Sequence, residues 1–225
     1  MFAVVVALLI GSVAGTELYS NQFLNDFTDA FLDVVLPIQL GKRPAAFPLG
    51  GFNVKVLKTW YTNRDLKAEF RNGRLTGLKQ TRALRKVGDC NRLQEGTNIT
   101  WSCTVEFPAL KAAYEGSARG EDLAGINRTL DVEATFVHPR GVIDILFFRS
   151  TLPVLKSWRV LPLDMRLIFS REPDLNAQRR KNLEDELKTN IGVAVTQVLY
   201  GPLQQDLNNT VSDTMSYVLL SGDNF

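Results

Sequence analysis

The sequence contains little of the chemistry on which most enzymes depend. Histidine occurs once, as His138, which excludes sites that need two histidines. Neither a Gly-x-Ser-x-Gly elbow nor a glycine-rich phosphate loop is present. His138 itself precedes a proline in a predicted surface turn, residues 138–141, where it is a poor candidate for a general base. The sequence therefore favours a binding protein with no catalytic residues, cofactor or metal, and a secreted enzyme is the remotest alternative.

Charge of one sign is also scarce. The 26 basic and 24 acidic residues leave a net charge of +2, which argues against a nucleic-acid partner. Two basic clusters nevertheless stand out. Glu184 and Asp185, beside the second, are interpreted as members of helical ion pairs on a solvated face rather than as a glycosidase dyad. The clusters are interpreted either as balanced surface charge or as a patch for anionic lipid head groups or a microbial surface. Their members are Lys79, Arg82, Arg85 and Lys86 in the first, and Arg179, Arg180 and Lys181 in the second.

Long hydrophobic runs are missing except at the amino terminus. Phe2–Ile10 is unbroken, and the small residues Ser12 and Ala14 follow it, as at a cleavage site. The run is shorter than the roughly 20 apolar residues that cross a bilayer, and no later segment looks transmembrane. We expect residues 1–15 to be a signal peptide and residues 16–225 to form one secreted, extracellular domain. A buried strand or an uncleaved anchor is the alternative for the run.

Two further features agree with export. Cys90 and Cys103 are the only cysteines, and an even count in a secreted chain predicts a disulfide, with two free buried thiols as the alternative. A bridge between them stabilises the fold by about 3 kcal/mol in the loop-entropy treatment. Asn-x-Thr glycosylation sequons begin at Asn98, Asn127 and Asn208, and the first lies inside the cysteine loop, which suggests an exposed tip.

Spacings of three and four residues predict helices at both ends of the chain. The first spans Glu17–Leu36 and is expected to stop at Pro37. The second runs over 175–219, about 65 Å if fully helical, with Asp174 as its N-cap. Gly201-Pro202 is expected to kink or break it. Its apolar stripe comprises Leu183, Leu187, Ile191, Val195, Val198 or Leu199, and then Leu203, Leu207, Val211 and Met215.

Between the helices, apolar and polar residues alternate as in strands. The alternation covers 52–56, 104–107, 130–136 and 163–169, and 142–148 is a largely apolar strand. Asn72-Gly73 predicts a hairpin turn. The order of helix, strands and long helix predicts an α+β fold, with an antiparallel sheet covered by helices from both ends.

One stretch resembles a known family. Gly77-Leu78-Lys79-Gln80 is followed, after Thr81–Leu84, by Arg85-Lys86-Val87-Gly88-Asp89, and the two runs together resemble the mite group 7 allergen family. Val198–Pro202 is similar to the interruption of that family's last helix. The resemblance implies the tubular lipid-binding (TULIP) superfamily, which includes the bactericidal/permeability-increasing, lipopolysaccharide-binding and insect takeout proteins. In that fold a curved antiparallel sheet wraps around a long C-terminal helix, accompanied by an N-terminal helix, and apolar ligands bind between them. An arthropod secreted protein is implied.

Two functional hypotheses follow. In the first, a lipid or other apolar small molecule binds between sheet and helices. In the second, the core is filled and the protein acts through its surface on a host or microbial partner, with residues 79–86 and the loop 90–103 as the contact region. Helical and strand periodicity are the same for a filled core and a lined cavity. The residues expected to face a ligand are Phe27, Phe31, Val132, Phe136, Met165, Leu167, Phe169, Leu187, Ile191 and Val195.

Overall fold

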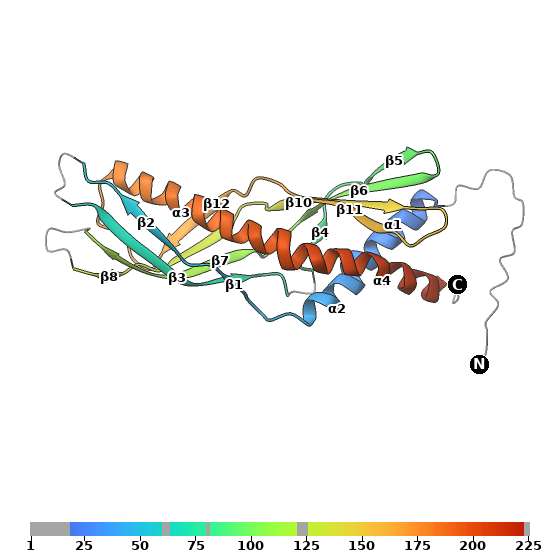
Figure 1. Ribbon diagram of the computed structural model, residues 1–225, viewed down its shortest axis with the longest axis horizontal. Coiled ribbons are helices and arrows are strands. Elements are labelled where there is room, and N and C mark those ends of the chain that lie inside the picture. Colours follow the sequence, from blue (N-terminus) through green and yellow to red (C-terminus); the bar gives the residue numbers. More distant parts are fainter. Residues whose placement is uncertain (1–18, 60–63, 80–81, 121–125, 223–225) are drawn as a thin grey trace, which may run out of the picture.

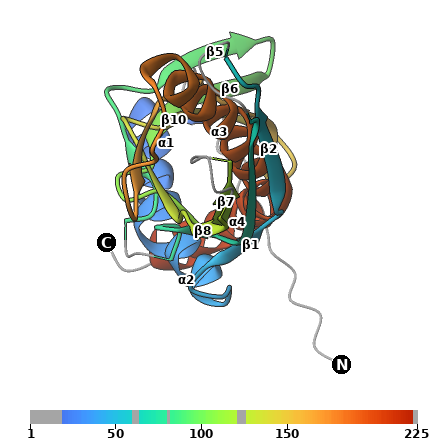
Figure 2. The same ribbon diagram turned by 90° about the vertical axis from the view of Figure 1, so that its left-hand side faces the viewer.

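The computed structural model describes residues 19–59, 64–79, 82–120 and 126–222. The expected signal peptide, 1–15, lies outside the described residues. The protein is an elongated rod with the C-terminal helices running along it (Figure 1). Viewed down its length, the strands and the long helix close around the rod axis (Figure 2). The predicted α+β architecture, with antiparallel strands, a long C-terminal helix and a short N-terminal helix, is confirmed.

The strands form two sheets. Sheet A has the order β1-β3-β7-β9-β12, with β2 beside β3 and β8 beside β7, and all its pairs are antiparallel. Alternate residues of its strands are buried, so one face lies against the core. Its strands are β1 (Phe47–Leu49), β2 (Phe52–Val56), β3 (Leu66–Thr76), β7 (Lys111–Arg119), β8 (Arg128–Thr129), β9 (Val132–Phe136) and β12 (Met165–Phe169).

Sheet B occupies the other half of the rod. Its order is β11-β10-β6-β4, with β5 also beside β6, again all antiparallel. The β9–β10 turn, which contains His138 at φ 46°, connects the two sheets. It is the turn predicted at 138–141, although Arg140 and Gly141 already belong to β10. The strands of sheet B are β4 (Arg85–Lys86), β5 (Asn91–Glu95), β6 (Asn98–Glu106), β10 (Arg140–Phe147) and β11 (Val154–Val160).

Each half of the rod is covered by its own helices. The N-terminal helices α1 (Asn21–Ala30), η1 (Phe31–Val35) and α2 (Leu36–Gly41) contact the C-terminal end of the long helix. The long helix consists of α3 (Ala177–Val198), η2 (Leu199–Leu203) and α4 (Gln204–Gly222). Its first part, α3, packs on β1, β2 and β12 of sheet A, whereas α4 contacts β11 of sheet B.

Pro37 and Pro202 do not end the helices in which they lie, so the predicted stop at Pro37 is wrong. Both prolines follow or occupy a five-residue π-helical turn, η1 before Pro37 and η2 around Pro202. In η1 the N–H of Leu36 bonds to the carbonyl of Phe31, five residues back. The wider turn accommodates a ring and a missing N–H that would clash with a regular α-helical turn. The long helix therefore continues past Gly201-Pro202 instead of breaking there.

Two other predictions from local sequence are also wrong, the hairpin turn at Asn72-Gly73 and the N-cap at Asp174. Asn72-Gly73 forms no hairpin but an irregularity inside β3, with Asn72 at φ 50°. A Cβ at Gly73 would lie 2.3 Å from the ring of Tyr114, so the glycine admits that ring. The N-cap of α3 is Asn176 rather than Asp174, because the Asn176 side chain accepts a hydrogen bond of 2.9 Å from a backbone N–H in the first turn.

Candidate apolar ligand site

Eight of the ten residues expected to face a ligand lie in the sheet A half. Met165 is opposite Phe136, and Phe169 is opposite Val132, so these side chains share the inner face of the sheet. Leu187, Ile191 and Val195 on α3 are fully buried and belong to the same core. Leu167 is partly buried against that core. The predicted pairing of strand and helix faces therefore exists in this half.

Phe27 and Phe31 lie elsewhere. The Phe27 ring is 5.0 Å from the ring of Phe147 on β10, centroid to centroid, so it packs on sheet B. Phe31 is stacked next to Phe27 and is buried in the same half. The ten residues all belong to one hydrophobic core, but they are divided between its two halves, because the strands form two sheets.

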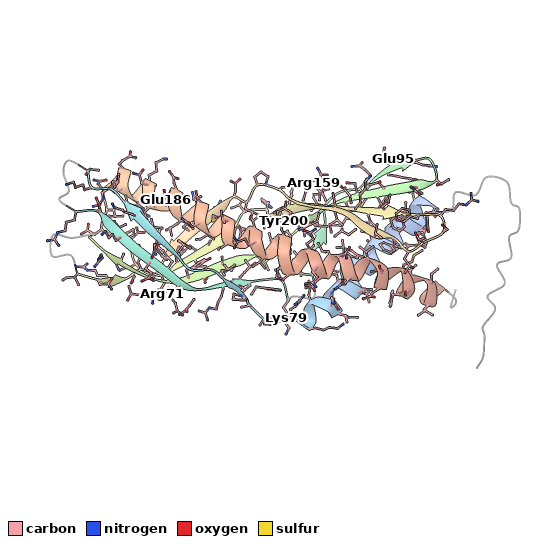
Figure 3. The ribbon with its side chains drawn as sticks, viewed as in Figure 1. Arg71, Lys79, Glu95, Arg159, Glu186 and Tyr200 are labelled. Carbon is pink, nitrogen blue, oxygen red and sulfur yellow. A yellow bond between two sulfur atoms is a disulfide. The ribbon has the colours of Figure 1, made fainter. Side chains whose placement is uncertain are left out.

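An open groove lies between α3 and the segment that connects β11 to β12. Its volume is about 660 Å³. Leu161, Val193 and Tyr200 present exposed apolar surface to it, and Tyr200 extends from the long helix near the middle of the rod (Figure 3). We call this the helix–sheet groove. Its lining consists of Val160, Leu161, Pro162, Leu163, Lys188, Thr189, Gly192, Val193, Thr196, Gln197 and Tyr200.

Gly192 lines the floor of the groove, and buried Met165 lies beneath it. Because Gly192 has no side chain, the surface of α3 is open at this position. A Cβ added to Gly192 would lie 3.8 Å from the methyl carbon of Met165. Leu163 and Leu167 are partly buried and continue the apolar floor into the core. A flexible thioether beside a missing side chain forms a wall that can move at low cost.

One end of the groove is held by two hydrogen bonds between β11 and the long helix. The Tyr200 hydroxyl accepts a 2.9 Å bond from the N–H of Val160, and the Trp158 indole N–H donates a 3.0 Å bond to the carbonyl of Leu199. Both partners on the helix lie in η2. The π-helical turn thus fixes β11 against the long helix. The 161–164 segment that follows is not itself a strand, but its ends are held by hydrogen bonds of 2.9 Å, from the N–H of Leu161 to the carbonyl of Arg140 and from the N–H of Val137 to the carbonyl of Asp164.

The opposite edge of α3 is chemically different. There a cleft of about 360 Å³ lies between α3 and β2 and is lined largely by polar or charged residues, including Lys55, Asp185 and Glu186. Asp185 pairs with Lys181 at 2.8 Å along the helix. Of these two clefts along α3, the helix–sheet groove is therefore the one that suits an apolar ligand.

Several residues of the two basic clusters form ion pairs or hydrogen bonds within the protein. Arg85 pairs with Glu106 at 2.8 Å, and Lys86 pairs with Asp29 of α1 at 3.2 Å. Hydrogen bonds from His138 and Arg85 lower the pKa of the Glu106 carboxyl. Half of the first cluster thus positions α1 and the junction between the sheets.

The second cluster is also paired. Arg179 is buried at the start of α3 and donates to the carbonyls of Arg64 and Gly120. Arg180 pairs with Glu184, and Lys181 pairs with Asp185, each one helical turn away. The interpretation of Glu184 and Asp185 as members of helical ion pairs fits these contacts.

The expected disulfide is present. Cys90 and Cys103 are bonded at 2.06 Å, 13 residues apart. The bridge holds the base of the β5–β6 hairpin, whose turn at Gly96-Thr97 places Asn98 at its tip. Asn127 is exposed beside β8. Asn208 is exposed on α4, although Thr210 of its sequon is fully buried.

Within residues 19–59, 64–79, 82–120 and 126–222, no three His, Cys, Asp or Glu side chains are grouped as a metal site would require. No helix in that part of the chain combines the length and apolar character needed to cross a membrane.

Known proteins resemble this chain over most of its length. Salivary anticoagulant protein P23 of Ixodes scapularis is 25% identical over 195 residues, which cover 84% of this chain and 86% of that protein. No protein-family model matches. Lipopolysaccharide binding protein superposes with a TM-score of 0.40 at 14% identity, over 87% of this chain but 37% of its own length. Epiphyas postvittana Takeout 1 superposes with a TM-score of 0.35 at 13% identity, over 86% and 90%.

Several groove residues have no counterpart in the sequence predictions. Leu161 and Pro162 lie outside any strand, and Val193 lies off the buried stripe of α3. Leu163 is predicted as the first residue of a strand over 163–169, but β12 begins at Met165, so Leu163 is free to line the groove. Gly192 offered the one usable signal, because a glycine in mid-helix costs about 1 kcal/mol relative to alanine and implies a packing or functional reason. Periodicity finds buried faces, whereas a groove is lined by residues at their margins.

Proposed function

We propose that this is a secreted, non-enzymatic protein that binds a lipid or another apolar small molecule in the helix–sheet groove. The apolar lining of the groove carries the proposal. Its volume of about 660 Å³ falls among typical small-molecule sites, which are mostly apolar with a few polar groups at defined positions. Membership of the mite group 7 and TULIP families, as one domain over 16–225, is part of this proposal.

In this proposal the ligand's apolar part lies along Leu161, Leu163 and Val193. Met165 moves aside to deepen the site, which gives an extended chain access to the space above Gly192. The buried residues beneath, from Val132 to Phe169 on sheet A and from Leu187 to Val195 on α3, form the packed support and the deeper wall. Phe27 and Phe31 stabilise the other half and do not contact the ligand.

Filling the groove tests the proposal. In Gly192→Leu the new side chain occupies the space above Met165, and the helix gains propensity at that position. We expect the variant to fold with equal or greater stability and to bind a fluorescent fatty acid at least tenfold more weakly. Gly41→Leu makes the same change in α2, where nothing lies within 4 Å of the added Cβ. If both variants bind the probe as the unmodified protein does, the groove is not the site.

Native mass spectrometry of the secreted, deglycosylated protein provides a complementary measurement. A co-purifying fatty acid, phospholipid or terpenoid that is present in the unmodified protein and absent from Gly192→Leu supports the proposal. Amino-terminal sequencing of the same secreted material locates the predicted cleavage near residue 15.

A second candidate function is an effect on blood coagulation through the protein surface. The observation that favours it is the 25% identity to a tick salivary anticoagulant over 84% of this chain. Plasma clotting time measured with the unmodified protein and with Gly192→Leu separates the two candidates. Equal prolongation by both proteins favours surface action, whereas prolongation lost in the variant makes the groove part of that activity.

A further inference from the structure

The outer face of sheet A holds a row of three cations. Lys55 on β2 is directly opposite Lys67 on β3, and Lys67 is directly opposite Arg119 on β7. The pairing of β7 with β8, extended by one residue, places Asn127 next in the row. All four residues are exposed. The row lies on the outer face of the sheet, and Lys55, on the edge strand β2, also borders the cleft beside α3.

Such a row is unfavourable for the sheet itself. Like charges directly opposite one another on neighbouring strands destabilise the pairing. Lys55 is relieved by Asp65 at 3.2 Å. A hydrogen bond from the Lys58 N–H, followed by the Lys55 ammonium, lowers the pKa of the Asp65 carboxyl, which is thus fully engaged. Within the described part of the chain, Lys67 and Arg119 have no carboxylate partner.

The row lies in a depression of about 490 Å³ on the sheet surface. The single carboxylate in its lining, Glu69, is bonded to Arg71 at 2.7 Å, and Figure 3 shows Arg71 on the side of the sheet away from the long helix. Three cations therefore face one already-paired carboxylate. The lining comprises Asn53, Val54, Lys55, Lys67, Ala68, Glu69, Ser117, Arg119 and Asn127, of which Val54 and Ala68 are buried.

We propose that this cation row is a binding site for a sulfated polysaccharide. Neighbouring strands lie about 4.8 Å apart, so the three charges span about 10 Å in a line, which suits a linear polyanion better than a single ion. Asn53, Ser117 and Asn127 add amide and hydroxyl groups for sugar hydroxyls. The lining presents no exposed large hydrophobic side chain, and an anionic membrane surface is usually bound by cations together with inserted apolar residues. The site is separate from the helix–sheet groove.

Heparin binding, measured over a series of NaCl concentrations, tests the proposal. Thr129→Ala in every protein removes the sequon at Asn127 and keeps the amide, so a glycan cannot cover the row. We expect Lys67→Gln and Arg119→Gln each to raise the heparin Kd about five- to tenfold at 0.15 M NaCl. Each substitution should also reduce the slope of log Kd against log salt by about one, as removal of one cation does for other polyanions.

Arg166→Gln is the matched control, since Arg166 is an exposed cation on β12, the opposite edge strand of sheet A from β2. We expect it to change the Kd less than twofold. Lys67→Gln and Arg119→Gln should also melt at the same or a higher temperature, because charge repulsion within the row is relieved. A purely structural role for the row predicts the opposite change in melting temperature.

Three results would overturn the proposal. They are undetectable heparin binding, an equal loss in all three variants, and binding to phosphatidylserine vesicles that is stronger than binding to heparin with the same dependence on Lys67 and Arg119. The last result would assign the row to a membrane surface instead.

Discussion

The two halves of the rod are held together by different kinds of contact. The sheet B half is fixed by the disulfide, by a bidentate pair between Arg43 and buried Asp206, and by a 2.9 Å bond from the Trp101 indole to Thr28. Apart from buried Arg179 in its first turn, α3 is joined to the sheet A half chiefly by apolar side chains, and clefts open along both edges of that helix.

This difference assigns a role to each half. Buried polar contacts have narrow geometric tolerance and lose much free energy when one partner moves. Apolar contacts are non-directional, so a helix can shift slightly on a sheet at lower cost. The sheet B half therefore serves as the rigid anchor, and the sheet A half is where an apolar molecule can enter. The predictions that follow test three polar contacts that hold the sheet B half together, from the largest expected effect on stability to the smallest.

Removing the charge partner of Asp206 should have the largest effect. The Asp206 side chain is fully buried on α4, and Arg43 follows α2, so the pair joins the two ends of the chain. Arg43→Met leaves a buried carboxylate without its partner, which is expected to cost about 3 kcal/mol in the free energy of unfolding. Urea denaturation measures the loss, and Arg166→Met on the sheet surface serves as control. A loss below 1 kcal/mol in the free energy of unfolding would mean that this ion pair does not hold the two ends of the chain together.

Thr28→Val should have a smaller effect in the same half. The Thr28 hydroxyl donates to the carbonyl of Leu24 and accepts from Trp101, so valine leaves the buried indole N–H unpaired. The expected loss is about 2 kcal/mol. Thermal or urea unfolding checks it against Thr135→Val on the outer face of β9. Similar stability of the two variants would show that the hydrogen bond contributes little.

The contact between Glu106 and His138 at the junction of the two halves should contribute least to the stability of the fold, and its contribution should depend on pH. Glu106 ends β6 and bonds to His138 in the β9–β10 turn at 2.9 Å, and its pKa is lowered by that bond and by Arg85. A carboxyl with a lowered folded pKa stabilises the fold above its unfolded pKa, and this contribution disappears as pH falls through the folded value.

Glu106→Gln should therefore lose about 1 kcal/mol near neutral pH. Its stability should approach that of the unmodified protein in strongly acidic solution. Unfolding measured from pH 7 down to pH 3 gives the comparison. A difference between the two proteins that stays constant over this range would show that the ion pair is not its cause.

The sequence was sufficient for those features that depend on local pattern. Period-two alternation identified strands such as β2, β9 and β12, and the three–four spacing identified a helix that runs the length of the rod. The cysteine count gave the disulfide. Local pattern failed where a tertiary contact used the same residues for another purpose: Asn72-Gly73 makes room for Tyr114, and both prolines are accommodated by π-helical turns.

The division of the strands into two sheets was decided only by tertiary structure. Alternation specifies which face of a strand is buried, but not which strand lies beside it, so Phe27 and Phe31 could not be separated from Met165 and Ile191 in advance. The groove above Gly192 and the cation row on sheet A share this origin. Both arise from residues distant in sequence that strand register and helix packing bring together, and register is set by long-range pairing rather than by any local run of residues.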